Sequence, residues 1–144
     1  MRLLSCLYSI QSSLSLIPPV RNSFATRGRR SRRFASVSGT VYDGAPLVTL
    51  FTKEGCTLCD KVKNVLHSIR EQQPHGLQQI DITDPDQTDY WKKYKYDIPV
   101  LHVNGKYWIK HRITEQEALK GLQQVQQGTF ESPPGEPNAT AMER

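Results

Sequence analysis

The sequence contains little cysteine. Three of its 144 residues are cysteines, too few for the disulfide framework of a small secreted scaffold. Cys6 lies near the N-terminus, so Cys56 and Cys59 are the cysteines left for the rest of the chain. No apolar run approaches about 20 residues, the length needed to span a bilayer. We therefore predict a soluble protein with no membrane partner.

Acidic residues are missing from residues 1–40, which contain seven arginines and no lysine. Removing those seven from the 19 basic residues leaves 12 against all 14 acids, so residues 41–144 carry a formal charge of −2. The basic balance belongs to the start of the chain. It gives no reason to expect that the folded part binds nucleic acid.

Residues 1–34 have the pattern of a mitochondrial presequence, which is amphipathic, rich in arginine and poor in acids. Apolar residues recur there at steps of three and four and so form one stripe on a helix, namely Leu3, Leu7, Ile10, Leu14 and Ile17. The run 32-RRFAS-36 also resembles a matrix-peptidase site with cleavage after Phe34. We predict the mitochondrial matrix as the location.

Two alternatives to a presequence stay open. The segment from Leu3 to Ile10 can be read as the apolar core of a secretory signal, and the sequon Asn138-Ala139-Thr140 would then be a glycosylation site. Polar residues interrupt that core early. The other alternative is a basic tail on a cytoplasmic protein.

Beyond the presequence we expect a linker at 35–45, one domain at 46–127 and a tail at 128–144. The tail is rich in proline and glycine and has few apolar groups. Such a segment cannot bury enough surface to offset the entropy lost on ordering. We expect the tail to be disordered.

The domain is expected to contain seven elements in the order strand, helix, strand, helix, strand, strand, helix. Apolar patterning places the strands at 47–52, 79–83, 100–103 and 106–109. The first helix follows the cysteines and is closed by Pro74 and Gly76, and the second spans 85–95 behind Asp84.

Local signals support the last three elements. Asn104-Gly105 suits a two-residue hairpin turn, and Thr114 with Glu117 forms a capping box at the start of the last helix. The first strand–helix–strand unit is expected to be a right-handed parallel crossover. The result is an α/β fold with a four-stranded mixed sheet and helices on both faces.

Cys56 and Cys59 are three residues apart at the start of a helix, where they can close a small disulfide ring. Cys56 faces the free backbone N–H groups and the positive end of the helix dipole. Both favour the thiolate, and in such motifs the cysteine pKa falls from about 8.5 to roughly 3.5–7.5. Cys56 would attack a substrate disulfide and Cys59 would resolve the mixed disulfide.

A proline opens the third strand, in Asp97-Ile98-Pro99-Val100. Proline cannot donate to a central ladder, so Pro99 indicates a bend or a cis bond. From this proline alone, a cis bond is less expected than a bend with a trans bond, since about 5–6% of X–Pro bonds are cis.

Together these features resemble a glutaredoxin-like protein with the thioredoxin-like fold. The resemblance rests on Lys53-x-x-Cys56-x-x-Cys59, Ile98-Pro99, the hairpin and the element order, over residues 46–126. It implies a thiol–disulfide oxidoreductase that exchanges electrons with protein or small-molecule disulfides through a reversible Cys56–Cys59 disulfide. It also implies a cis Pro99 beside the cysteines, with Ile98 contacting the substrate backbone.

Lys53 is a further candidate substrate-binding residue, because its ammonium group can receive a carboxylate. A monomer is expected.

Three positions depart from the family pattern. Thr57-Leu58 stands where the dithiol class has Pro-Tyr, and Asp97-Ile98-Pro99 stands where glutathione binders commonly have Thr-Val-Pro. The run 110-KHRIT-114 replaces the Gly-Gly-x-Asp motif, so bulky and basic side chains occupy the place through which glutathione approaches. We expect no bound cofactor, and glutathione is disfavoured as the reductant.

The same residues also allow other functions. A thioredoxin-fold binding module with little turnover, docking a partner, a metal or an iron–sulfur cluster, is the alternative to an enzyme. One CxxC needs two more ligands to hold a metal, and His67, His102 and His111 are not spaced as a pair, so no metal site is predicted. The run 90-YWKKYKY-96 is interpreted as a helix whose aromatic side chains pack toward the sheet, rather than as a nucleic-acid surface.

Overall fold

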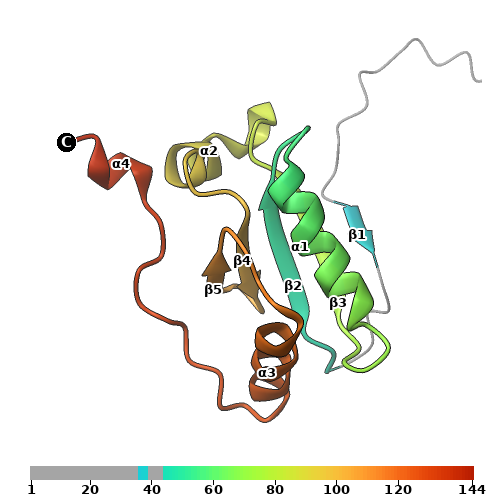
Figure 1. Ribbon diagram of the computed structural model, residues 1–144. Coiled ribbons are helices and arrows are strands. Elements are labelled where there is room, and N and C mark those ends of the chain that lie inside the picture. Colours follow the sequence, from blue (N-terminus) through green and yellow to red (C-terminus); the bar gives the residue numbers. More distant parts are fainter. Residues whose placement is uncertain (1–35, 39–43) are drawn as a thin grey trace, which may run out of the picture. The chain divides into compact units, whose positions relative to one another are not determined.

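A mixed sheet with the strand order β1-β3-β2-β4-β5 forms the centre of the fold (Figure 1). The computed structural model describes residues 36–38 and 44–144, and the predicted presequence lies outside them. The strands are β1 Ser36–Ser38, β2 Leu47–Thr52, β3 Gly76–Asp81, β4 Val100–Val103 and β5 Lys106–Lys110. β2 and β3 are parallel, and every other neighbouring pair is antiparallel.

The predicted four-stranded mixed sheet is confirmed. The structure adds β1, which pairs antiparallel with β3. This strand comes from the segment 35–45, which the sequence analysis treats as a linker. Three residues of strand are too short to show a periodicity of their own, so the pairing has no local signature.

The helices are α1 Thr57–Ser68, the short 3-10 turn η1 Pro85–Gln87, α2 Thr88–Tyr94, α3 Glu115–Gln126 and α4 Ala139–Met142. The capping box at the start of α3 is present as predicted. α1 ends at Ser68 rather than near Pro74, and β3 begins at Gly76, three residues before the predicted start. Asp84 precedes η1 but makes no side-chain cap hydrogen bond, so this start signal is weaker than its sequence suggests. In the described part of the chain, no helix is long and apolar enough to cross a bilayer.

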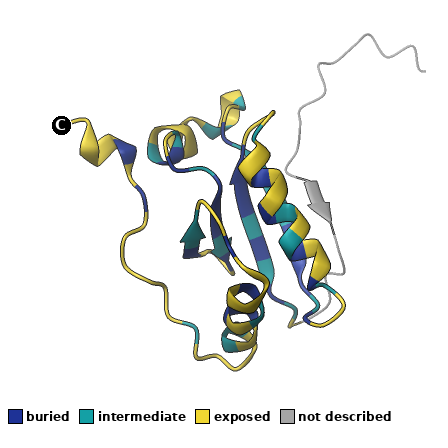
Figure 2. Cartoon of the chain, in the orientation of Figure 1, coloured by how far each residue is buried: buried dark blue, intermediate teal, exposed yellow. Residues whose placement is uncertain are grey.

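Figure 2 shows buried residues along β2, β3 and β4. Apolar side chains are buried on both faces of the sheet. Alternation along each strand divides these side chains between two layers. Helices α1 and α3 cover one layer, which contains Val48, Leu50, Val62, Leu66, Ile69, Leu77, Leu101, Val103, Trp108, Ala118 and Leu122. Helix α2 covers the other, which contains Phe51, Ile82, Tyr94, Val100 and Tyr107.

Helix α2 is shorter than predicted, and only one of the three aromatic residues expected to pack toward the sheet is fully buried. Tyr94 has no exposed surface, whereas Tyr90 and Trp91 are 36% and 42% exposed. Tyr90 still contacts Phe51, with ring centroids 4.6 Å apart. Helix α2 has only seven residues, and it buries Tyr94 against the sheet while leaving Tyr90 and Trp91 partly exposed.

Helix α3 approaches the sheet closely at one glycine. A Cβ placed on Gly121 would lie 2.5 Å from Cζ2 of Trp108, closer than real Cβ contacts. The indole of Trp108 therefore lies directly against the helix backbone at Gly121, and this layer has no room for a side chain at position 121.

The C-terminal strap, residues 129–144, runs from the end of α3 past β5 to α2 (Figure 1). It was expected to be disordered, but the structure gives it defined contacts. Ser132 Oγ donates to the carbonyl of Tyr107 at 2.8 Å, and Thr140 Oγ1 donates to the carbonyl of Lys92 at 3.1 Å. Ala139, in α4, is fully buried.

Glu136 is the main polar anchor of the strap. Its Oε1 accepts hydrogen bonds from Tyr94 Oη at 2.6 Å and from Lys93 Nζ at 2.5 Å, and it lies 3.5 Å from His102 Nε2. Burial opposes ionisation of Glu136, but the bonds from Lys93 and Tyr94 outweigh it and lower its pKa. Burial first, and then the bond to Glu136, raise the pKa of Tyr94 far above its usual value.

Candidate functional site

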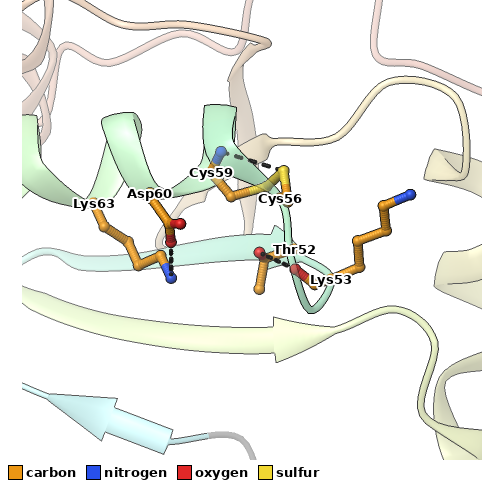
Figure 3. Close-up of a disulfide and its surroundings, with 6 residues drawn as sticks. All are labelled: Thr52, Lys53, Cys56, Cys59, Asp60 and Lys63. Carbon is orange, nitrogen blue, oxygen red and sulfur yellow. Dashed lines mark hydrogen bonds and ion pairs between the residues drawn. A yellow bond between two sulfur atoms is a disulfide. The ribbon is translucent and has the colours of Figure 1, made fainter.

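The cysteine pair lies where β2 gives way to α1 (Figure 3). β2 ends at Thr52, and Gly55 then adopts a positive φ of 72° that favours glycine. This turn delivers Cys56 to the N-cap of α1 with an extended backbone. The backbone N–H of Cys59 donates to Cys56 Sγ at 3.2 Å, so the sulfur is the N-cap acceptor, a role usually filled by a side-chain oxygen.

The two sulfurs have different surroundings. Cys56 and Cys59 form a disulfide, with their Cα atoms 5.3 Å apart. Cys59, in the first turn of α1, is fully buried, whereas Cys56 is partly exposed. A reagent in solution can therefore reach Cys56 but not Cys59. Once the disulfide is reduced, the N–H group of Cys59 and the positive end of α1 both favour the thiolate form of Cys56.

Strand pairing brings Pro99 to the same edge of the sheet as the cysteines. Val100 is paired with Phe51, so the next step of the antiparallel register places Pro99 beside Thr52, four residues before Cys56. The Ile98–Pro99 bond is cis, as the family resemblance implies. Pro99 is buried, and Ile98 is partly buried against the layer under α2.

A buried carboxylate ties the proline loop to the end of β5. Asp97 is 7% exposed and accepts a hydrogen bond from Lys110 Nζ at 2.6 Å. His111 Nε2 lies 3.3 Å from the same oxygen, and the His111 N–H donates to the carbonyl of Pro99 at 2.7 Å. His111 has a positive φ of 70°, which is uncommon for a residue other than glycine. These contacts hold residues 97–99, just before β4, against residues 110–111, at the end of β5.

Sequence reasoning missed this tie. The signal was present, since both segments stood out as departures from the family pattern. The pairing itself depends on the β4–β5 register, in which Val100 lies opposite Lys110.

Lys53 is exposed, and its side chain extends away from Cys56 Sγ in Figure 3. It lines a polar cavity of about 380 Å³ together with Lys63 and the carboxylates of Glu54, Asp60, Asp81 and Asp84. Asp60 is paired with Lys63 at 2.8 Å, so its charge is balanced within the first turns of α1. Lys53 is therefore not placed to stabilise the cysteine sulfur directly.

The histidines do not gather around the cysteines as ligands. His67 is exposed on α1, His102 meets Tyr94 Oη at 3.0 Å, and His111 faces Asp97. Across residues 36–38 and 44–144, no three His, Cys, Asp or Glu side chains are grouped as they would be to hold a metal ion.

Comparison with known proteins agrees with this geometry. The family model described as glutaredoxin-like domain (DUF836) matches residues 47–123, from the start of β2 to within α3. This span is more than half of the chain and includes both cysteines and Pro99. The chain belongs to the glutaredoxin-like (DUF836) family.

A curated member of this family is similar over most of its own length. The protein named Glutaredoxin-like protein YDR286C homolog, from Dictyostelium discoideum, is 30% identical over 82 residues, which cover 54% of this chain and 76% of that protein. The family assignment and the Cys56–Cys59 disulfide together indicate a capacity for thiol redox chemistry.

Proposed function

We propose that this glutaredoxin-like protein is a thiol–disulfide oxidoreductase. The observation that carries the proposal is the asymmetry of the pair, in which a partly exposed Cys56 caps α1 and a fully buried Cys59 lies behind it. A nucleophile must meet the substrate, whereas a resolving thiol needs only to reach the nucleophile. The two cysteines meet these requirements in that order.

In the forward direction, the thiolate of Cys56 attacks one sulfur of a substrate disulfide. A Cys56–substrate mixed disulfide forms, and the other substrate sulfur leaves as a thiolate that takes a proton from water. Cys59 then loses its proton and attacks Cys56 Sγ, which releases the second substrate thiol and forms the Cys56–Cys59 disulfide. The substrate gains two electrons, and an external dithiol or thiol pair returns the protein to its reduced form.

The proline loop supplies the proposed platform for the substrate chain. Pro99 lies at the same sheet edge as Cys56, and the backbone of Ile98 precedes it, so an extended segment of a partner has a surface on which to align. Lys53 is exposed in the turn between β2 and Cys56, where it can meet an anionic group. Disulfides of proteins or of small molecules both fit this arrangement.

Glutathione is not the proposed reductant. The run 110-KHRIT-114 places Lys110 and His111 in contact with Asp97, so these bulky side chains are fixed where the family has two glycines. A protein dithiol is the alternative donor. We also propose that the protein works as a monomer without a bound cofactor, and that residues 1–34 direct it to the mitochondrial matrix.

The test follows the two sulfurs separately in the full chain. Cys59→Ser is expected to accumulate a mixed disulfide with a substrate, visible as a mass increase that dithiothreitol removes. Cys56→Ser is expected to form none, and Cys6→Ser serves as the matched control and should behave as the parent protein. Equal trapping by the Cys56 and Cys59 variants would contradict the proposed roles. Absence of trapping together with no turnover of the disulfide would favour a binding module.

A further inference from the structure

A groove runs along α1 away from the cysteine pair. One wall is a stripe of α1 side chains, and the other is the connection between β5 and α3; together they enclose about 370 Å³ and comprise Leu58, Lys61, Val62, Val65, His111, Arg112 and Ile113. Leu58 lies between Cys56 and Cys59 in the sequence, so one end of the groove is formed by a residue two positions after the reactive cysteine. It occupies a different place from the polar cavity beside Lys53.

The floor of the groove is apolar. Val62 and Ile113 are 3% and 6% exposed, so they form a buried base, and Val65 is partly buried beside them. Leu58, in the first turn of α1, is 45% exposed. Its side chain is therefore available to contact a partner at the mouth of the groove.

The rim of the groove is cationic. Lys61, His111 and Arg112 line it, and no acidic residue does. The carboxylates that neighbour the rim residues have other partners: Asp60 pairs with Lys63, Asp97 pairs with Lys110, and Glu115 accepts a hydrogen bond from Ser68. Within the described ranges, Lys61 and Arg112 form no ion pair, so the rim has positive charge that is not balanced by the protein.

We propose that this groove binds a segment of the substrate protein that carries an acidic residue and an apolar residue close to its reactive cysteine. The proposal rests on the oxidoreductase function proposed above and names its substrate class. An apolar side chain would contact Leu58 and Val62, and a carboxylate would lie between Lys61 and Arg112. Charge complementarity of this kind raises the association rate and discriminates against partners of the wrong sign.

The length of the groove limits the position of the acid. Leu58 and Val65 are seven residues apart on α1, or about 10 Å at 1.5 Å per residue. About three residues of an extended chain cover that distance at roughly 3.3 Å each. The acidic residue is therefore expected within about three residues of the substrate cysteine on one side.

The experiment uses the full chain and three matched disulfide peptides. The peptides carry Leu-Glu, Leu-Gln or Leu-Lys beside one cysteine, and the rate constant of their reduction is measured at low and at physiological salt. The Glu peptide is expected to react about tenfold faster than the Lys peptide at low salt, with the Gln peptide between them. Salt should narrow the difference, because exposed charges are screened.

Substitutions at the rim locate the effect. Lys61→Gln and Arg112→Gln are each expected to reduce the preference for Glu a few-fold, since exposed ion pairs are individually weak. Arg112→Glu should invert the preference. Lys106→Gln, an exposed lysine at the far end of β5, is the matched control and should retain it. Reduction of hydroxyethyl disulfide, which has no charge, should be unchanged in Lys106→Gln.

The outcomes separate this proposal from the function on which it rests. Equal rates for the three peptides, with normal reduction of hydroxyethyl disulfide, would overturn the groove proposal and leave the oxidoreductase in place. Failure to reduce any disulfide would instead remove the proposed function and the groove proposal together. Glutathione disulfide is measured as a further substrate. If it is reduced clearly faster than the Glu peptide, the proposal that the groove binds a protein segment is overturned.

Discussion

The contact between Tyr94 and Glu136 gives the sharpest test of the C-terminal strap. Tyr94 is fully buried, and its hydroxyl donates to Glu136 at 2.6 Å. The substitution Tyr94→Phe removes that donor and keeps the ring. Because the residues are 42 positions apart, the bond exists only if the strap lies against α2.

The magnitude follows from burial on the two sides of the bond. Hydrogen bonds to charged groups contribute about 1.5–3 kcal/mol. The Glu136 side chain is 36% exposed and also paired with Lys93, so water and the lysine replace part of the lost interaction. We expect Tyr94→Phe to lower the free energy of unfolding by about 1 kcal/mol, which is about 4–8 °C in Tm for a domain of this size.

A double-mutant cycle isolates the contact. Tyr94→Phe, Glu136→Gln and the double variant are unfolded with urea at pH 7 and followed by far-ultraviolet circular dichroism. A coupling energy of about 0.5–1 kcal/mol is expected, as for residues in direct contact. Tyr96→Phe removes the hydrogen bond of an exposed tyrosine to Glu143 and is the control, for which no resolvable loss is expected. Additive effects of the Tyr94 and Glu136 substitutions would refute the docking of the strap.

Three other expectations address pH, packing and the site. Burial lowers the pKa of His75 and of His102, so the unfolded chain binds more protons than the folded chain. The free energy of unfolding is therefore expected to fall as the pH drops below about 6.5. A urea midpoint that does not change between pH 7.5 and 5.5 would contradict this. Gly121→Ala is expected to lower the free energy of unfolding by about 1 kcal/mol, because overpacking against Trp108 outweighs the gain of up to about 1 kcal/mol in helix propensity. A raised Tm would show instead that this layer has room for a methyl group. Asp97→Asn leaves Lys110 and His111 without their anionic partner. We expect the free energy of unfolding to fall by about 1–2 kcal/mol, a value discounted for the partial exposure of the lysine, and disulfide reduction to slow. Asp60→Asn is the control and should show neither effect.

Features with a local cause could be predicted from the sequence. Asn104 and Gly105 both adopt positive φ, which a two-residue hairpin turn requires. The capping box joins Thr114 to Glu117 over three residues, and the turn before Cys56 needs only Gly55. In each case the residues that determine the geometry are neighbours in the chain.

Features that depend on distant partners could not be predicted in the same way. The strap has the composition of a disordered tail, and its order depends on Glu136 meeting Lys93, Tyr94 and His102. Asp97 reads as an ordinary acid until the β4–β5 register places Lys110 beside it. The groove along α1 exists because residues 111–113 lie against the helix. Neither the sequence of the helix nor that of residues 111–113 indicates this contact by itself.

The packing of Trp108 under Gly121 has a practical consequence for spectroscopy. The chain contains two tryptophans, and they lie in contrasting surroundings, with Trp108 8% exposed in the core and Trp91 42% exposed on α2. Indole fluorescence shifts to longer wavelength as water gains access to the ring. The blue part of the emission therefore reports the integrity of the layer under α3, and the red part reports events at α2, where the strap is attached. The protein thus carries two intrinsic optical probes, and each can be assigned by replacing the other tryptophan with phenylalanine.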